Sequence, residues 1–207
     1  MITTPIHNYS EITEGQKDVL KEIGSIGAGN ATTALSQMLN RKINMKIPDV
    51  KLIAINKLAE LIGGPENPVV GILLTLKGDL NGMMLFVMEQ ASARRLANLV
   101  LMLNSDARCF TEMDFSALKE IGNIIAGAYM TSISALTGLH TRSSVPSVAY
   151  DMAGAVLSVP AIEFGKLGDK ALLIESNFDE TVDQVDGFFI LIPDMDSYNT
   201  IMSKVGM

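Results

Sequence analysis

Residues 13–38, TEGQKDVLKEIGSIGAGNATTALSQM, recur as residues 111–136, TEMDFSALKEIGNIIAGAYMTSISAL. Twelve positions are identical in the two copies, and in the first copy they are Thr13, Glu14, Leu20, Lys21, Glu22, Ile23, Gly24, Ile26, Ala28, Gly29, Thr33 and Ser36. Composition alone would give far fewer matches, so the repeat indicates a duplicated structural unit. We therefore expect a fold made of two copies of one arrangement.

The duplication continues beyond these segments. Pro48 and Pro146 follow the two copies at the same spacing. Each half reads as a long helix, strands, a turn with glycine, another strand and a final helix, which is predicted at Ser92–Leu103 and at Ser197–Val205. No low-complexity linker separates the halves. We expect a single domain over residues 1–207, with repeat one at about 13–103 and repeat two at about 111–207.

The repeated segment has the pattern of a helix with one buried and one polar face. Thr13-x-x-Gln16 has the spacing of a capping box, which predicts that the first helix begins at Thr13. Polar and small residues recur at intervals of four, three and four, which places them above one another on a helix. These residues are Asp18, Glu22, Ser25 and Gly29 in the first copy, and Ser116, Glu120, Asn123 and Gly127 in the second.

This polar stripe has two interpretations. A row of Glu and Asn on one helix is most often a solvated face, and small residues most often serve helix packing. Packing would explain the glycines but not a glutamate placed twice. Glycine inside a helix costs up to ~1 kcal/mol relative to alanine. Its presence at both Gly29 and Gly127 therefore suggests that something approaches the helix closely there.

Composition excludes several classes of function. The formal net charge is −7 and no basic stripe is present, which argues against nucleic-acid binding. Cys109 is the sole cysteine, so no disulfide forms within the chain; we expect a small buried or half-buried apolar residue there. No signal peptide or membrane-spanning run is recognisable. These features predict a cytoplasmic protein without membrane insertion, whose partner is another protein.

At the repeated helix, the sequence resembles the CheC family of chemotaxis phosphatases, which includes CheC, CheX and FliY. The family signature is Asp or Ser, three residues, Glu, two residues, Asn, then 22 residues and Pro. The second copy matches it completely with Ser116, Glu120, Asn123 and Pro146. The first copy matches with Asp18, Glu22 and Pro48, but has Ser25 where the family has Asn. Two sites without a further C-terminal domain resemble the CheC type within the family most closely.

The resemblance implies both a fold and an activity. The implied fold is α/β (α+β) with pseudo-two-fold symmetry, in which the two long signature helices pack beside each other against a shared, mainly antiparallel sheet. The implied reaction is hydrolysis of the aspartyl phosphate on the response regulator CheY. The implied second partner is the receptor deamidase CheD. A duplicated chain mimics a dimer, so we expect a monomer.

The residues suit this chemistry. Hydrolysis of an aspartyl phosphate needs a water molecule in line with the phosphorus, and a neutral carboxamide such as that of Asn123 can orient water without repelling the phosphoryl group. Glu120 can pair with a basic group of the receiver and fix its docking position. The receiver's own divalent metal, expected to be magnesium, would stabilise charge, so this chain needs no metal or cofactor. The shorter Ser25 predicts a weak or silent first site beside Glu22.

Other interpretations remain open. A scaffold that binds CheY or CheD without meaningful catalysis would use the same docking groups, and in a purely structural oligomer of duplicated domains the stripe would be idle. Gly24-Ser25-Ile26-Gly27-Ala28-Gly29 resembles a phosphate-binding loop, but it lies inside a predicted helix rather than between a strand and a helix. Asp194 and Asp196 are predicted to cap the last helix rather than to bind metal.

Overall fold

The computed structural model describes residues 12–41, 43–45, 49–54, 57–103, 109–164, 170–180 and 184–207. Its elements occur in one order that is repeated once. The first half contains α1 (Glu14–Leu39), β1 (Ile43–Met45), β2 (Asp49–Ala54), α2 (Leu58–Leu61), β3 (Pro68–Gly78), β4 (Gly82–Glu89) and α3 (Gln90–Leu101). The second half contains α4 (Glu112–Thr137), β5 (Thr141–Ser143), β6 (Ser147–Met152), α5 (Ala153–Phe164), β7 (Lys170–Glu180), β8 (Gln184–Pro193) and α6 (Met195–Lys204).

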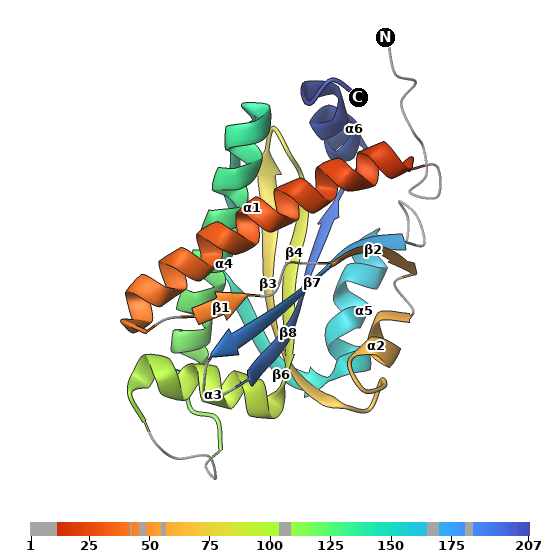
Figure 1. Cartoon of the computed structure of the whole chain (residues 1–207). Helices are drawn as coiled ribbons and strands as arrows, with labels where there is room; N and C mark the ends of the chain where they lie inside the picture. Colours follow the sequence, from red (N-terminus) through yellow and green to blue (C-terminus); the bar gives the residue numbers. More distant parts are fainter. Residues whose placement is uncertain are drawn as a thin grey trace.

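The strands form one antiparallel sheet around which the two halves are arranged symmetrically (Figure 1). β4 and β8 lie at the centre, where Phe86 is opposite Phe189. β3 flanks β4 and carries β5 and β6 on its outer side, while β7 flanks β8 and carries β1 and β2. Strands of the same kind therefore occupy equivalent places on the two sides, as the pseudo-two-fold prediction requires.

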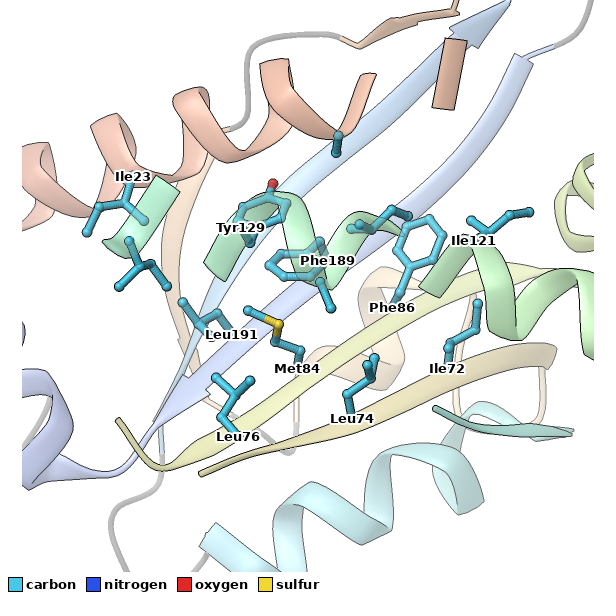
Figure 2. Close-up of a cluster of buried hydrophobic side chains, with 14 of the residues drawn as sticks. Ile23, Ile72, Leu74, Leu76, Met84, Phe86, Ile121, Tyr129, Phe189 and Leu191 are labelled. Atoms are coloured by element: carbon cyan, nitrogen blue, oxygen red, sulfur yellow. The ribbon is translucent and has the colours of Figure 1, made fainter. Parts of the chain in front are cut away.

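The core lies mainly between this sheet and the long helices α1 and α4 (Figure 2). Alternate residues of β3 and β4 face the helices because successive side chains of a strand point to opposite faces. Among them, Ile72, Met84 and Phe86 meet Ile121 and other apolar residues of the helices. A smaller cluster on the opposite face joins the sheet to α2 and α5 through Leu58, Val69 and Leu157. The fold class predicted from the resemblance is confirmed.

The sequence analysis placed most helices correctly and missed two. The final helices of the two halves are α3 and α6, each beginning two residues before its predicted start. α2 and α5 were not predicted. α2 has four residues, too few for a helical period to show, and α5 is apolar on nearly every side and contains Pro160. The prediction for Cys109 was wrong, because its side chain is exposed just before α4.

Candidate functional site

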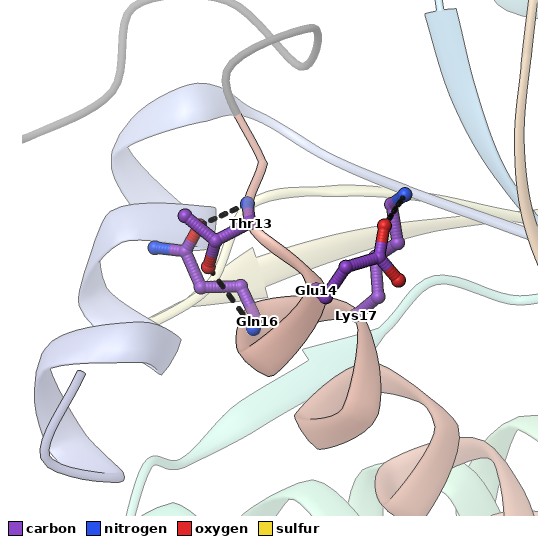
Figure 3. Close-up of polar contacts among 4 residues, drawn as sticks. All are labelled: Thr13, Glu14, Gln16 and Lys17. Atoms are coloured by element: carbon purple, nitrogen blue, oxygen red, sulfur yellow. Dashed lines mark hydrogen bonds and ion pairs between the residues drawn. The ribbon is translucent and has the colours of Figure 1, made fainter.

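Both signature helices begin with a capping box (Figure 3). In α1 the Gln16 N–H donates to Thr13 Oγ1 at 3.3 Å, and the Thr13 N–H donates to Gln16 Oε1 at 3.0 Å, as predicted. One turn on, the Lys17 ammonium binds Glu14 at 2.6 Å and lowers the pKa of that carboxyl. In α4 the equivalent pair is Thr111 and Asp114, joined by the Thr111 N–H at 2.7 Å. The start of each helix is therefore set by its own sequence.

The two helices cross near their middles and touch directly (Figure 1). Gly27 of α1 lies against the ring of Tyr129 of α4, and the Asn30 side-chain amide donates to Ser132 Oγ at 3.1 Å. At 1.5 Å per residue, Glu22 precedes Gly27 by about 8 Å and Glu120 precedes Tyr129 by about 14 Å along their helices. The two glutamates therefore lie away from the crossing point, each on its own helix, and both are exposed.

The polar stripes lie on the outward faces of these helices. The more exposed members are Asp18, Glu22, Gly29, Ser116, Glu120 and Asn123, whereas Ser25 and Gly127 are half-buried. No hydrogen bond or ion pair of Glu22, Glu120 or Asn123 is found among the described residues. Since α4 positions Glu120 and Asn123 one turn apart, their carboxylate and carboxamide can face one external group together.

The signature proline of the second copy packs between α4 and the sheet. Pro146 is buried, and a Cβ added at Gly122 would lie 3.7 Å from the Pro146 Cβ and 2.6 Å from Ile72 Cγ2 of β3. Gly122 therefore lets α4 lie close to the sheet, and Pro146 fills the space beside it. Both residues hold the segment that carries Asn123. The corresponding Pro48 of the first copy lies outside the described residues.

The glycines of the stripe differ from those of the core. A Cβ added at Gly29 or at Gly127 would meet no atom of the described chain within 4 Å. Close packing against the described part of the chain therefore does not account for either glycine. Each leaves a bare stretch of helix beside Ser25 or Asn123, as a closely approaching partner would need.

Two rival interpretations of the sequence can be compared with the structure. The Gly24–Gly29 segment is interior to α1, so it does not form the strand-to-helix turn of a dinucleotide site. Asp194 is the N-cap of α6, where its carboxylate accepts a hydrogen bond from the Ser197 N–H at 2.8 Å, as predicted. Across the described ranges, no cluster of three or more His, Cys, Asp or Glu could hold a metal ion. No helix among them is long and apolar enough to span a bilayer.

Comparison with known proteins gives a consistent result. Residues 16–52 match the model of the CheC-like family, and residues 70–162 match that of the chemotaxis phosphatase CheX. The chain is 37% identical to the CheY-P phosphatase CheC of Bacillus subtilis, over 96% of this chain and 97% of that protein.

Solved structures share the fold. The crystal structure of Thermotoga maritima FliY matches with a TM-score of 0.75 and 23% identity, covering 94% of this chain and 98% of that one. A chain of the CheX-CheY-BeF3-Mg complex of Borrelia burgdorferi matches with a TM-score of 0.55 and 20% identity, covering 81% of this chain and 95% of that one. Since it is 37% identical to a CheC protein over nearly the full length of both, and both signature helices carry an exposed polar stripe, this chain belongs to the CheC-like family.

Proposed function

We propose that this protein hydrolyses the aspartyl phosphate of the response regulator CheY. The observation that carries the proposal is the outward placement of Glu120 and Asn123, one turn apart on α4. The named activity of the Bacillus subtilis relative supports it, as does the CheX structure solved with CheY, BeF3 and magnesium.

In this mechanism Asn123 positions the attacking water. Its carboxamide can accept a hydrogen bond from the water and also donate one, and it carries no charge that would repel the phosphoryl oxygens. Holding water in line with phosphorus removes much of the orientational cost of the reaction. The receiver's magnesium would stabilise the charge that develops on the phosphoryl group, and this chain supplies the water-orienting group.

Glu120 docks the receiver in the same mechanism. Its exposed carboxylate can form a charge-assisted hydrogen bond with a basic side chain of CheY and fix the register of the complex. A role as general base is less attractive, since an ordinary Glu, with a pKa of about 4.3, is a weak base at neutral pH. In repeat one Glu22 would dock in the same way, but Ser25 would hold water less well. We therefore assign most turnover to the second site.

A phosphate-release assay with phosphorylated CheY tests this assignment. We expect Asn123→Ala to lower kcat by about 100-fold, the order associated with a misplaced reactant. Ser25→Ala should change kcat less than twofold, and Glu120→Ala should act mainly on KM. Glu60→Ala, an exposed glutamate on α2 at the opposite face, is the control. Near-full activity of Asn123→Ala together with loss of activity in Glu22→Ala would overturn the assignment.

The competing proposal is an adaptor that binds CheY or CheD without meaningful catalysis. Ser25, which departs from the signature, is the observation that favours it. The same assay separates the two functions. If phosphorylated CheY decays at its intrinsic rate with this protein in excess, while the two proteins still bind each other, the adaptor function is correct.

We also propose a cytoplasmic monomer of one domain over residues 1–207 that binds CheD. The repeated element order and the single shared sheet support the domain assignment. Light scattering of the purified chain would give its mass directly, and a twofold mass would exclude the monomer. Calorimetric titration of this protein with purified CheD tests whether the two proteins bind.

A further inference from the structure

The register of the sheet changes where β5 is followed by β6. β5 ends with Ser143 opposite Leu76, and β6 begins with Ser147 opposite Leu73, so three residues, 144–146, stand opposite two residues of β3. This is the arrangement of a β-bulge, which bends its strand and redirects its side chains. The signature proline of the second copy is the last of the three residues, so it belongs to the bulge.

The same change of register occurs in repeat one. β1 ends with Met45 opposite Phe178, and β2 begins with Asp49 opposite Glu175. In the sequence, the two signature prolines stand directly before β2 and directly before β6. Proline is accepted at the bulge of an edge strand because it has no N–H to contribute to the ladder. The register change therefore belongs to the repeated unit.

Ser144 fastens the second bulge to β3 through both its backbone and its side chain. Its N–H donates to the Thr75 carbonyl at 2.8 Å, and its Oγ accepts a hydrogen bond from the Thr75 N–H at 3.0 Å. The Ser144 hydroxyl also donates to the Val145 carbonyl at 3.1 Å. In a regular antiparallel pair a backbone carbonyl would accept from the Thr75 N–H. Here the Ser144 hydroxyl takes the place of that carbonyl and keeps the backbone group paired.

The bulge places Pro146 against the part of α4 that carries Asn123. Pro146 is buried, and a Cβ added at Gly122 would lie 3.7 Å from the Pro146 Cβ. The same added atom would lie 2.6 Å from Cγ2 of Ile72, which is fully buried in β3. α4 therefore approaches the sheet closely at Gly122. Asn123 is the next residue, so its position depends on this contact.

We propose that Ser144 is a positioning residue for the second site. Its hydroxyl holds the bulge to β3, the bulge holds Pro146 against α4, and this contact sets where the Asn123 carboxamide holds the attacking water. The proposal rests on the proposed function and extends it to a residue outside the signature. A displacement of about 1 Å can lower a rate by about 100-fold when a reactant must be held in line. Docking through the long Glu120 side chain tolerates the same displacement, so kcat should fall while KM stays.

Steady-state phosphate release from phosphorylated CheY by Ser144→Ala tests the proposal. Removing the hydroxyl leaves the Thr75 N–H without its acceptor, so we expect kcat to fall about fivefold and KM to stay within twofold. Ser144→Thr keeps a hydroxyl at this exposed position, so its kcat should stay within twofold.

The matched control is Ser147→Ala, the same substitution three residues further on. Ser147 is exposed, and its register partner Leu73 packs with the cluster on the sheet face opposite α4. No hydrogen bond of the Ser147 side chain is found among the described residues. Its kcat should therefore equal that of the unmodified protein.

Two further measurements separate positioning from a general loss of stability. Hydrogen exchange at the Thr75 amide should be faster in Ser144→Ala than in Ser144→Thr, since only the first variant loses the acceptor. In the Asn123→Ala background, Ser144→Ala should lower kcat no further, because no carboxamide is left to misplace.

Three results would overturn the positioning proposal alone. They are equal kcat values in Ser144→Ala and Ser147→Ala, unchanged exchange at Thr75, and a further fivefold fall of kcat when Ser144→Ala is added to Asn123→Ala. Absence of phosphate release by the unmodified protein would instead overturn the proposed function.

Discussion

The ring of Tyr129 in α4 occupies the place where a side chain at Gly27 of α1 would lie. A Cβ added at Gly27 would overlap three atoms of that ring. The ring has no room to retreat, because Tyr129 is fully buried and stacks on Phe189 of the central strand β8 with centroids 4.1 Å apart. The separation of the two signature helices therefore depends on the absence of a side chain at residue 27.

Gly27→Ala is expected to destabilise the protein by about 1–2 kcal/mol. Overpacking a closed contact costs about 1–3 kcal/mol, and the better helix propensity of alanine offsets part of this. Urea unfolding followed by circular dichroism measures the change. Gly29→Ala is the matched control two residues away, and it should stabilise by up to about 1 kcal/mol because its Cβ meets no neighbour. A stabilising effect of both variants would show that Tyr129 does not set the helix spacing.

Gly127→Ala is expected to separate stability from activity. Its added methyl group meets no atom of the described chain, so the free energy of unfolding should rise by up to about 1 kcal/mol, as for Gly29→Ala. If the receiver lies against α4 at this bare stretch, KM for phosphorylated CheY should rise severalfold in Gly127→Ala and stay unchanged in Gly29→Ala. Equal KM values in the two variants would remove the argument that Gly127 makes room for a partner.

Ser25→Asn is expected to complete the first site. Glu22 already lies on the exposed face of α1, and the substitution supplies the carboxamide that Asn123 supplies on α4. In the Asn123→Ala background, Ser25→Asn should raise phosphate release at least tenfold. Glu22→Ala in the same chain should lower this recovered activity, which controls for an unrelated effect of the new asparagine. No recovery would mean that repeat one lacks more than the carboxamide.

The residue patterns predicted features within single helices, and the family resemblance predicted how the helices and sheet pack, but neither predicted individual contacts between elements. The polar stripe and the Thr13–Gln16 cap each involve residues only a few positions apart, so the spacing of residue types in the sequence predicts them. The Thr111–Asp114 cap has Asp where the capping-box pattern has Glu or Gln, so the pattern does not predict it. The Gly27–Tyr129 contact joins two helices that are distant in sequence, and it can be found only when the helix crossing is known. No spacing rule reveals it.

Thr111→Ala is expected to destabilise the protein by about 1 kcal/mol, the usual cost of losing a side-chain N-cap. The Thr111 hydroxyl donates to the Asp114 carboxylate at 2.7 Å, and the Asp114 N–H is oriented towards the same hydroxyl oxygen. Asp114 is 1% exposed, so the loss of this partner is not readily made up by water. Thermal unfolding measures the effect. Thr131→Ala is the control, since that hydroxyl is exposed and donates to the Gly127 carbonyl of its own helix, where water can replace it.

Alkaline unfolding is expected to depend on Tyr198 of α6. Burial raises the pKa of this phenol above its ordinary value of about 10, because the charged form is disfavoured away from water. Between the unfolded and the folded pKa the unfolded chain releases a proton that the folded chain retains. Stability contributed by the neutral phenol is therefore complete below pH 10 and is lost as the pH rises above it, by about 1.4 kcal/mol per pH unit.

Tyr198→Phe should reduce the slope of the unfolding free energy against pH above pH 10. Tyr150→Phe, which alters a tyrosine that is 42% exposed, should leave the slope unchanged, and equal slopes in all three proteins would refute the assignment to Tyr198.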